Sequence, residues 1–426
     1  MLLRRLALFT FIPRYIYVSA FDLQATNNVA LYWGQNSARK PTSTISPTYL
    51  ILTPTKPELT PQPPLKSYCT RPEIDIIILS FIATLYSAEK IPILNHVTEQ
   101  CSPTNTPGGQ VVCPELAMEI EYCRGLGKKV LVSLGGATAG YEIGSEVEAV
   151  NAANQVWNTY LGGAKDGTIR PFGEVELDGI DLDLESPSGQ EGLYWPIFIE
   201  TIRSLYQTQP GRNGKTDYLI SASPQCVYPD VILSPALRDK RSWFDMLFIQ
   251  FYNNICAPTN PTSFNFNEWA EWARSSSLNP NVKLFIGSPA SPAAAPSGGF
   301  TPLETLLEIS SESMEDCEAA RVFWNSGASG TNSTSSGYNP FGGIAFWDAS
   351  WTSAEYTAAT KAGLTGSWER VKARNQFFKR QEFESKQAEG EAESAAERGK
   401  SRGTSSTGAR ASRRRHTIRR RHRHRR

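Results

Sequence analysis

Three carboxylates stand at every second position in residues 178–185, which read DGIDLDLE. They are Asp181, Asp183 and Glu185, and they alternate with Ile180, Leu182 and Leu184. Alternation with a period of two is typical of a β-strand, so the three carboxylates are expected to share one face of it. In a barrel strand whose other face packs under helices, that acidic face points into the barrel interior. Burial there is costly for each charge unless the group is protonated or paired.

Such a row suits acid catalysis on an acetal. Carboxyl groups held a few ångströms apart cannot all ionise, so at least one pKa rises and a proton stays available near neutral pH. Glu185 ends the row, nearest the open end of the barrel, and is the expected proton donor. Asp183 is expected to turn toward Glu185 or toward the substrate. The alternative, a solvated acidic edge strand, is disfavoured by the apolar residues between the carboxylates and by the leading Asp178-Gly179 pair.

Eight apolar segments predict strands, and helical spacing lies between several of them. The expected strands are residues 28–33, 74–81, 129–134, 178–185, 218–223, 246–252, 283–288 and 343–347, and the helical segments include 115–126, 194–206 and 267–275. This alternation predicts an α/β fold, a (β/α)8 TIM barrel, in which strand C-terminal ends carry the chemistry. The 426-residue length fits one catalytic domain with appendages. The domain is expected at residues 21–370, without an α+β insertion before the last strand.

The two ends of the chain predict appendages. Residues 1–20 place Arg4 and Arg5 ahead of an apolar run and finish with small residues, Val18-Ser19-Ala20, and so predict a secretory signal. An ordinary N-terminal extension is the alternative. Residues 371–426 become rich in Glu, Ala and Ser and then in Arg and His, so this tail is expected to be disordered. Residues 38–67 are Pro- and Thr-rich and predict a loop insertion after the first strand. No stretch is long and apolar enough to span a bilayer.

Charge is distributed unevenly along the chain. Residues 376–426 carry 16 Lys and Arg against 6 Glu, although the formal net charge of the whole chain is only +1. A basic tail can bind nucleic acid, but a secreted protein has little opportunity to do so, and no nucleic-acid partner is expected. Anionic wall polymers or membranes are more plausible contacts of this tail, and a disordered end without a selected function is the favoured interpretation. Histidines in the tail are interleaved with arginines that repel cations, so no metal site is expected.

Five short motifs resemble one enzyme family. The matching segments are residues 178–185, 133–136 (SLGG), 31–36 (LYWGQN), 224–226 (PQC) and 250–254 (QFYNN). The first two resemble the DxxDxDxE and SxGG motifs of glycoside hydrolase family 18, and the others resemble its class III, hevamine-like chitinases of plants and fungi. This resemblance, from residue 28 to about 362, implies a secreted or cell-wall endochitinase. It implies chitin and N-acetylglucosamine oligomers as substrates, no cofactor and a monomer.

The resemblance also implies roles for the carboxylates. Family 18 enzymes have no protein nucleophile and retain configuration by substrate assistance. Glu185 would protonate the leaving oxygen while the substrate's own acetamido carbonyl attacks the anomeric carbon. Asp183 would orient the acetamido N–H and stabilise the oxazolinium charge, and Asp181 would share a proton with Asp183. Tyr252 would hydrogen-bond the attacking carbonyl.

Other residues are expected to hold the sugar. Gln250 would shape the acetamide pocket, Trp347 would form the hydrophobic floor beneath the sugar, and Tyr32 would lie beside it. Gly135 and Gly136 of the SxGG motif are expected to line the cleft. The alternative for each side chain is structural, because core aromatics and inward polar residues are also used to fill barrels.

Seven cysteines suggest three disulfide bonds and one remaining thiol, but their spacing leaves the pairing open. The resemblance implies the pairs Cys69–Cys123, Cys101–Cys113 and Cys226–Cys256, with Cys317 left over. Asn332 begins an Asn-Ser-Thr sequon and is a predicted glycosylation site.

Two other functions compete with the chitinase. Some barrels of this family have lost catalysis and act as lectins or as inhibitors of other enzymes, usually by replacing the acid. The presence of Asp181, Asp183 and Glu185 disfavours that alternative. Related enzymes also cut the Asn-linked glycan core or bacterial peptidoglycan, and a muramidase side activity stays open.

Overall fold

The structure is a computed structural model. It describes residues 21–39, 62–95, 101–106, 108–137, 140–185, 192–212, 214–325 and 338–366. All of them belong to one compact unit, Met1–Gly366. The predicted signal, most of the 38–67 insertion, the sequon at Asn332 and the tail from residue 371 lie outside the described residues. Within the described ranges, none of the helices has both the length and the apolarity that a membrane span requires.

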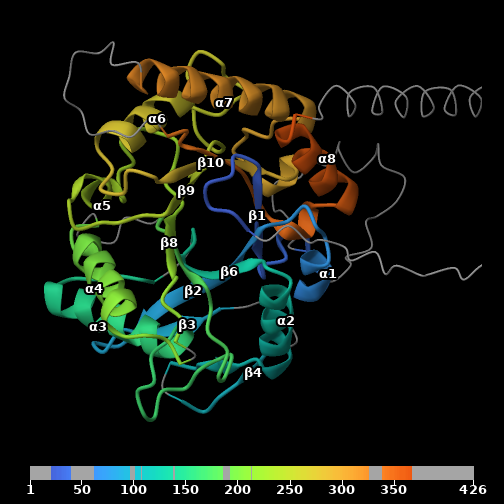
Figure 1. Ribbon diagram of the computed structural model, residues 1–426. Coiled ribbons are helices and arrows are strands. Elements are labelled where there is room, and N and C mark those ends of the chain that lie inside the picture. The colour runs from blue at the N-terminus through green and yellow to red at the C-terminus, as the bar shows by residue number, and fades with distance from the viewer. Residues whose placement is uncertain are drawn as a thin grey trace, which may run out of the picture. The chain divides into compact units, whose positions relative to one another are not determined.

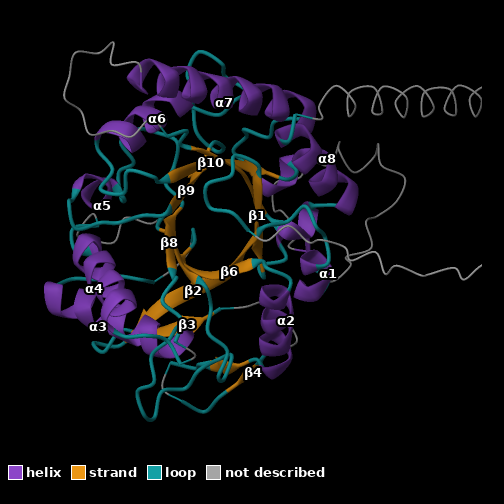
Figure 2. Cartoon of the chain, in the orientation of Figure 1, coloured by secondary structure: helices purple, strands orange, loops and turns teal. Residues whose placement is uncertain are grey.

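Eight parallel strands close into a barrel, which confirms the predicted (β/α)8 fold. In chain order they are β1 (Asn28–Trp33), β2 (Ile76–Tyr86), β6 (Lys129–Gly135), β7 (Gly179–Asp183), β8 (Leu219–Ala222), β9 (Met246–Gln250), β10 (Lys283–Pro289) and β11 (Phe341–Trp347). Each strand pairs with the next one in this series, and β11 pairs with β1 to close the ring. Figure 2 shows this ring end-on, with the helices outside it.

The helices follow the strands along the chain and cover the outside of the barrel (Figure 1). They are α1 (Leu65–Cys69), α2 (Pro114–Gly125), α3 (Glu146–Tyr160), α4 (Trp195–Thr208), α5 (Ser234–Arg238), α6 (Phe266–Ser275), α7 (Leu303–Asn325) and α8 (Ala354–Leu364). Side-chain caps mark two of their starts. The Ser145 hydroxyl accepts the Glu148 N–H at α3, and the Ser353 hydroxyl accepts the Tyr356 N–H at α8.

Several short elements decorate this frame. Beyond the barrel, β2 continues outward and pairs antiparallel with β3 (Ile91–Leu94), an arm that the sequence pattern did not predict. β4 (Ser102–Pro103) pairs with β5 (Val111–Val112), and 3-10 turns η1 (Ser37–Arg39), η2 (Pro292–Ala294) and η3 (Ala349–Trp351) lie on loops. Between β10 and β11 the described residues contain η2 and α7.

The barrel interior is layered from apolar to polar. Its apolar residues include Ala30, Ile76, Ile78, Leu131, Met246, Phe248 and Phe285, all buried. Two residues further along several of these strands, the same inward face carries Tyr32, Ser133 and Gln250, because side chains alternate with a period of two. The apolar layer therefore supports a polar layer at the C-terminal ends of the strands.

Three disulfide bonds secure the loops and helices around the barrel. They are Cys69–Cys123, which joins α1 to α2, Cys101–Cys113, and Cys226–Cys256, which joins the loops after β8 and β9. These are the three pairs that the resemblance implied. Cys317 is free and buried, and burial raises the pKa of its thiol to about 11, so it stays protonated.

Asp178, the first residue of the acidic motif, secures the N-terminal end of β7. It is buried, accepts the Val130 N–H at 2.9 Å, and pairs with Lys215 at 2.9 Å and Arg124 at 3.4 Å. Removing one partner of such a buried network is strongly destabilising. We expect Asp178→Ala to lower the free energy of unfolding by about 3 kcal/mol in urea denaturation.

The matched control for this prediction is Asp217→Ala. Asp217 pairs with the same Lys215, but its side chain is 67% exposed. Exposed ion pairs contribute about 0–1 kcal/mol, so this variant is expected to unfold almost as the parent does. Equal losses in the two variants would show that Asp178 has no special structural role.

Candidate active site

Strand register brings the predicted site residues to one end of the barrel. Asp181 of β7 lies opposite Ser133 of β6, and Asp183 lies opposite Gly135. On the other side, Asp181 lies opposite Ser221 of β8. Glu185 follows two residues after the end of β7. The acidic face therefore points inward, as the alternation predicts.

Four hydroxyl groups surround Asp181. They belong to Ser133 and Ser221, each at 2.7 Å, and to Tyr32 and Ser223, each at 3.0 Å. Burial raises the pKa of Asp181, and the hydrogen bonds from these hydroxyls lower it. A carboxylate with this many donors is fixed in orientation. Asp181 is thus held below the cleft, with Tyr32 and Ser223 also hydrogen-bonded to each other.

Asp183 and Glu185 form a coupled pair above Asp181. Burial raises the pKa of Asp183 well above its ordinary value, and the neighbouring charges of Glu185 and Asp181 raise it further. Burial also raises the pKa of Glu185. The Gln250 side-chain N–H donates to Asp183 at 2.8 Å and to the Ser223 carbonyl at 3.1 Å, which fixes the position of Asp183. The pair therefore retains a proton at pH values where isolated carboxyls have lost theirs.

A cleft of about 290 Å³ opens over this pair. Its lining includes Gln35, Phe81, Asn95, Gly135, Gly136, Asp183, Glu185, Gln250, Tyr252 and Trp347. A smaller cavity of about 10 Å³ is lined by Tyr32, Asp183, Ser223, Phe248, Gln250, Tyr252, Gly287, Ala345 and Trp347. Asp183, Gln250, Tyr252 and Trp347 line both, so the two spaces share one wall. All predicted site residues except Asp181 line one or both of them.

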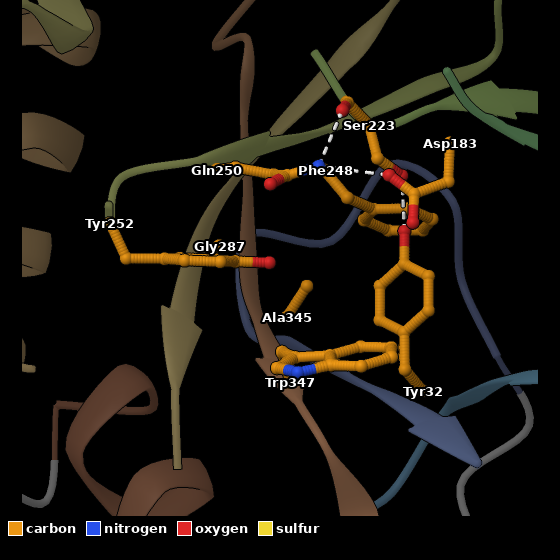
Figure 3. A pocket seen from close by; sticks show the side chains of 9 residues that line it. All are labelled: Tyr32, Asp183, Ser223, Phe248, Gln250, Tyr252, Gly287, Ala345 and Trp347. Carbon is orange, nitrogen blue, oxygen red and sulfur yellow. Dashed lines mark hydrogen bonds between the residues drawn. The ribbon is translucent and has the colours of Figure 1, made fainter. Parts of the chain in front are cut away.

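Aromatic side chains form the floor and one side of the cavity. The Trp347 ring lies 5.8 Å from the Tyr32 ring and stacks on Phe81 at 5.6 Å, between ring centroids. Figure 3 shows the Tyr252 hydroxyl pointing into the space above Trp347. Burial raises the pKa of Tyr252 well above its ordinary value, and Asp183 raises it further, so its hydroxyl remains a hydrogen-bond donor.

The glycine pair permits the close contact between β6 and β7. A Cβ at Gly135 would lie 2.0 Å from the carbonyl oxygen of Asp183, and its φ of +116° also favours glycine. The Gly136 N–H donates to that same carbonyl at 2.7 Å. Gly135 is therefore needed to position Asp183 as well as to line the cleft.

Several residues around the site had no role in the sequence-based prediction. Ser221 and Ser223 contact Asp181, and their alternation in residues 218–223 (YLISAS) is the signal that would have indicated an inward polar face. Asp348 follows Trp347 and is buried. It accepts the Ser37 N–H at 3.1 Å and the Ser350 N–H at 2.9 Å. Asp348 thereby ties the end of β11 to η1, and no periodic pattern marks it.

A barrel with coupled carboxyl groups in a cleft at its strand C-terminal ends has the architecture of a glycoside hydrolase. The chain belongs to one family of that class, since the sequence model described as "Glycosyl hydrolases family 18" matches residues 28–298. The family that the five motifs resemble is thereby confirmed.

Named relatives agree with this assignment. "Chitinase 2" of Rhizopus oligosporus is 33% identical over 324 residues, 76% of this chain and 49% of that protein. "Class III chitinase" of Arthroderma benhamiae is 33% identical over 316 residues, 70% of this chain and 85% of that protein. This chain spans about half the length of several curated fungal relatives.

Solved structures of similar fold include both enzymes and inhibitors. A chitinase from Ipomoea carnea is 29% identical, with a TM-score of 0.54, over 79% of this chain and 98% of that one. A xylanase and α-amylase inhibitor protein from Scadoxus multiflorus is 25% identical, with a TM-score of 0.53, over 80% of this chain and 99% of that one. The fold alone therefore does not decide between catalysis and binding.

Proposed function

We propose that this chain is an endochitinase, which hydrolyses β-1,4 links between N-acetylglucosamine units and retains the anomeric configuration. The observation that carries the proposal is the full row of Asp181, Asp183 and Glu185 beside one cavity, with Tyr252 and Trp347 in its wall. An inhibitor or lectin needs no proton donor. The intact row therefore favours an enzyme.

The proposed reaction has two steps. First, the Glu185 carboxyl gives its proton to the glycosidic oxygen while the acetamido carbonyl oxygen of the substrate bonds to the anomeric carbon, and the leaving chain departs. Second, the Glu185 carboxylate takes a proton from water, whose oxygen bonds to the anomeric carbon as the oxazolinium ring opens. Glu185 is then protonated again, and the product is the β-anomer.

The other residues hold the acetamide in a reactive position. Asp183 orients the acetamido N–H and stabilises the positive oxazolinium charge, and Asp181 tunes Asp183 by sharing a proton with it. Tyr252 donates its hydroxyl to the attacking carbonyl, while Trp347 supports the sugar ring. Because the acetamide is part of the substrate, positioning alone supplies a large part of the rate.

The test is the anomeric form of the first products. Chitotetraose is incubated with the full chain, and proton NMR follows the products before mutarotation. Shorter oligomers released as the β-anomer support the proposal. Release of the α-anomer would exclude substrate assistance, and binding without hydrolysis would instead place this chain with the lectin-like and inhibitor barrels.

We also infer that the chain is secreted and cuts within polymers. Three disulfide bonds suit an oxidising compartment. Between β10 and β11 the described residues form η2 and α7 and contain no α+β insertion, so an open groove is expected. Products formed strictly from chain ends of long chitin would contradict the endo-type cleavage.

The pH dependence of activity should reflect Glu185. A proton donor must be protonated, so kcat/KM falls as the pH rises through its pKa. Burial raises that pKa, hydrogen bonds with Asp183 and Gln250 lower it, and the charge of nearby Asp230 raises it. The net shift is upward, so the basic limb should lie above the range in which an ordinary glutamate titrates. Asp230→Asn removes this charge and should move the basic limb to lower pH.

The matched control for the pH profile is Asp166→Asn, at an exposed position on the loop after α3. This variant should keep the basic limb of the parent. A basic limb that stays in place in Asp230→Asn would show that another group controls it.

A further inference from the structure

Exposed apolar side chains gather on three loops at the C-terminal end of the barrel. They are Leu193 (55% exposed), Val227 (40%), Tyr228 (39%), Val231 (70%) and Ile255 (75%). Leu193 follows β7 in the chain, the next three lie on the loop after β8, and Ile255 lies on the loop after β9. Apolar residues scattered singly on a surface need no explanation, but a cluster indicates an interaction site. We call these five residues the apolar ridge.

A disulfide bond joins the second and third loops of the ridge. In the Cys226–Cys256 bridge the two Cα atoms are 5.9 Å apart, and Val227 and Ile255 are the chain neighbours of these cysteines. The Tyr228 ring packs edge-on against the buried Trp269, at 5.1 Å between centroids. This end of the ridge is therefore held in place.

A close backbone contact joins the first loop to the second. A Cβ at Gly192 would lie 2.1 Å from the carbonyl oxygen of Ile232, so the two backbones are in close contact. Leu193 follows Gly192 and Val231 precedes Ile232, so this contact brings the two loops together. The loop after β8 is itself compact, because the buried Asp230 carboxylate accepts the N–H of Ile232 at 2.9 Å. The five side chains thus lie on one connected set of loops.

The ridge begins where the cleft ends. Asn254, the neighbour of Ile255, donates to the Gln225 side chain at 3.4 Å, and Gln225 forms a β-bridge with Gln250. Gln250 and Asn253 line the cleft. A polymer that leaves the cleft over these loops would therefore pass directly onto the ridge.

We infer that the apolar ridge binds long chitin chains outside the cleft; this inference rests on the proposed function. Chitin is uncharged, and it presents the C–H faces of its sugar rings together with acetamide methyl groups. The ridge also carries no charge in its five side chains, and it offers one aromatic ring in Tyr228. In the proposed function chitotetraose is bound and cut in the cleft, so the ridge should matter for the polymer and not for this short oligomer.

The test compares two variants with matched substitutions. Val231→Ser combined with Ile255→Ser removes the two most exposed ridge side chains. Val147→Ser makes the same change on α3, where the valine is 70% exposed, as Val231 is. We expect the double variant to bind and hydrolyse insoluble chitin about tenfold less well than the parent. Its kcat/KM on chitotetraose, and both activities of Val147→Ser, should be unchanged.

Other outcomes would overturn the inference. Equal binding of insoluble chitin by the parent and the double variant would show that the polymer does not use the ridge. A parent that sediments as a dimer, and a double variant that sediments as a monomer, would assign the ridge to a second copy of the chain. If the parent fails to cut chitotetraose yet its binding of insoluble chitin needs the ridge, the proposed function fails and the ridge inference stands.

Discussion

Replacing Glu185 by glutamine should lower kcat on chitotetraose by about 10³-fold and leave binding of the oligomer nearly unchanged. Glutamine keeps the size and shape of the side chain but has no acidic proton to give to the leaving oxygen. Glu185 lines the cleft and carries a pKa raised by burial, which are the two properties that a proton donor requires. Steady-state kinetics would measure the loss, and calorimetric titration with chitotetraose would measure binding.

The matched control is Glu142→Gln, at an exposed glutamate between β6 and α3. It should hydrolyse chitotetraose at the rate of the parent. A Glu185→Gln variant that keeps more than about a tenth of the parent kcat would show that another group donates the proton. Asp183, buried beside Glu185, would then be the first candidate.

The barrel itself was predictable because its strands are buried on both faces. Parallel strands of this kind appear in a sequence as short, nearly continuous apolar runs, as in residues 74–81 (IDIIILSF). The run ends there, however, while β2 continues to Tyr86 and pairs with β3. This arm was not predicted, although residues 82–86 (IATLY) remain mostly apolar. Outside the barrel the strand is partly exposed, and nothing in the local sequence indicates its antiparallel partner.

The carboxylate row was predictable because its spacing is local. The surroundings of Asp181 were not, since its donors come from β1, β6 and β8, more than 35 residues away along the chain. Only the register of neighbouring strands brings Ser133 and Ser221 to the same level as Asp181. A single sequence contains no direct signal for that register. The roles of these residues in catalysis stay predictions.

The position of Trp347 shows the same division between local and distant information. A tryptophan at the end of the last strand was expected to form the floor of the site, and it lines both the cleft and the cavity. What fixes the strand end is Asp348, whose partner Ser37 lies 311 positions earlier in the chain. Burial raises the pKa of Asp348, while its hydrogen bonds to Ser350 and Ser37 lower it. The contact between Asp348 and Ser37 forms only when the barrel closes, so the sequence alone does not indicate it.

Asp183→Asn is expected to lower kcat on chitotetraose by about 10²- to 10³-fold. Asparagine has nearly the same shape and retains an oxygen that can accept the Gln250 N–H, so the site should keep its geometry. It cannot, however, become the anion that stabilises a positive oxazolinium ring. Asp166→Asn, at an exposed position, is the matched control and should keep the parent rate.

The double variant Asp183→Asn with Glu185→Gln tests whether the two carboxyls act as one unit or as two independent groups. If the two carboxyls share one proton and act in the same step, the double variant should lose little more activity than Glu185→Gln alone, because residues that act as a unit are strongly non-additive. Independent groups would instead multiply their separate losses. Multiplied losses would show that Asp183 and Glu185 stabilise the transition state independently and do not act as one unit.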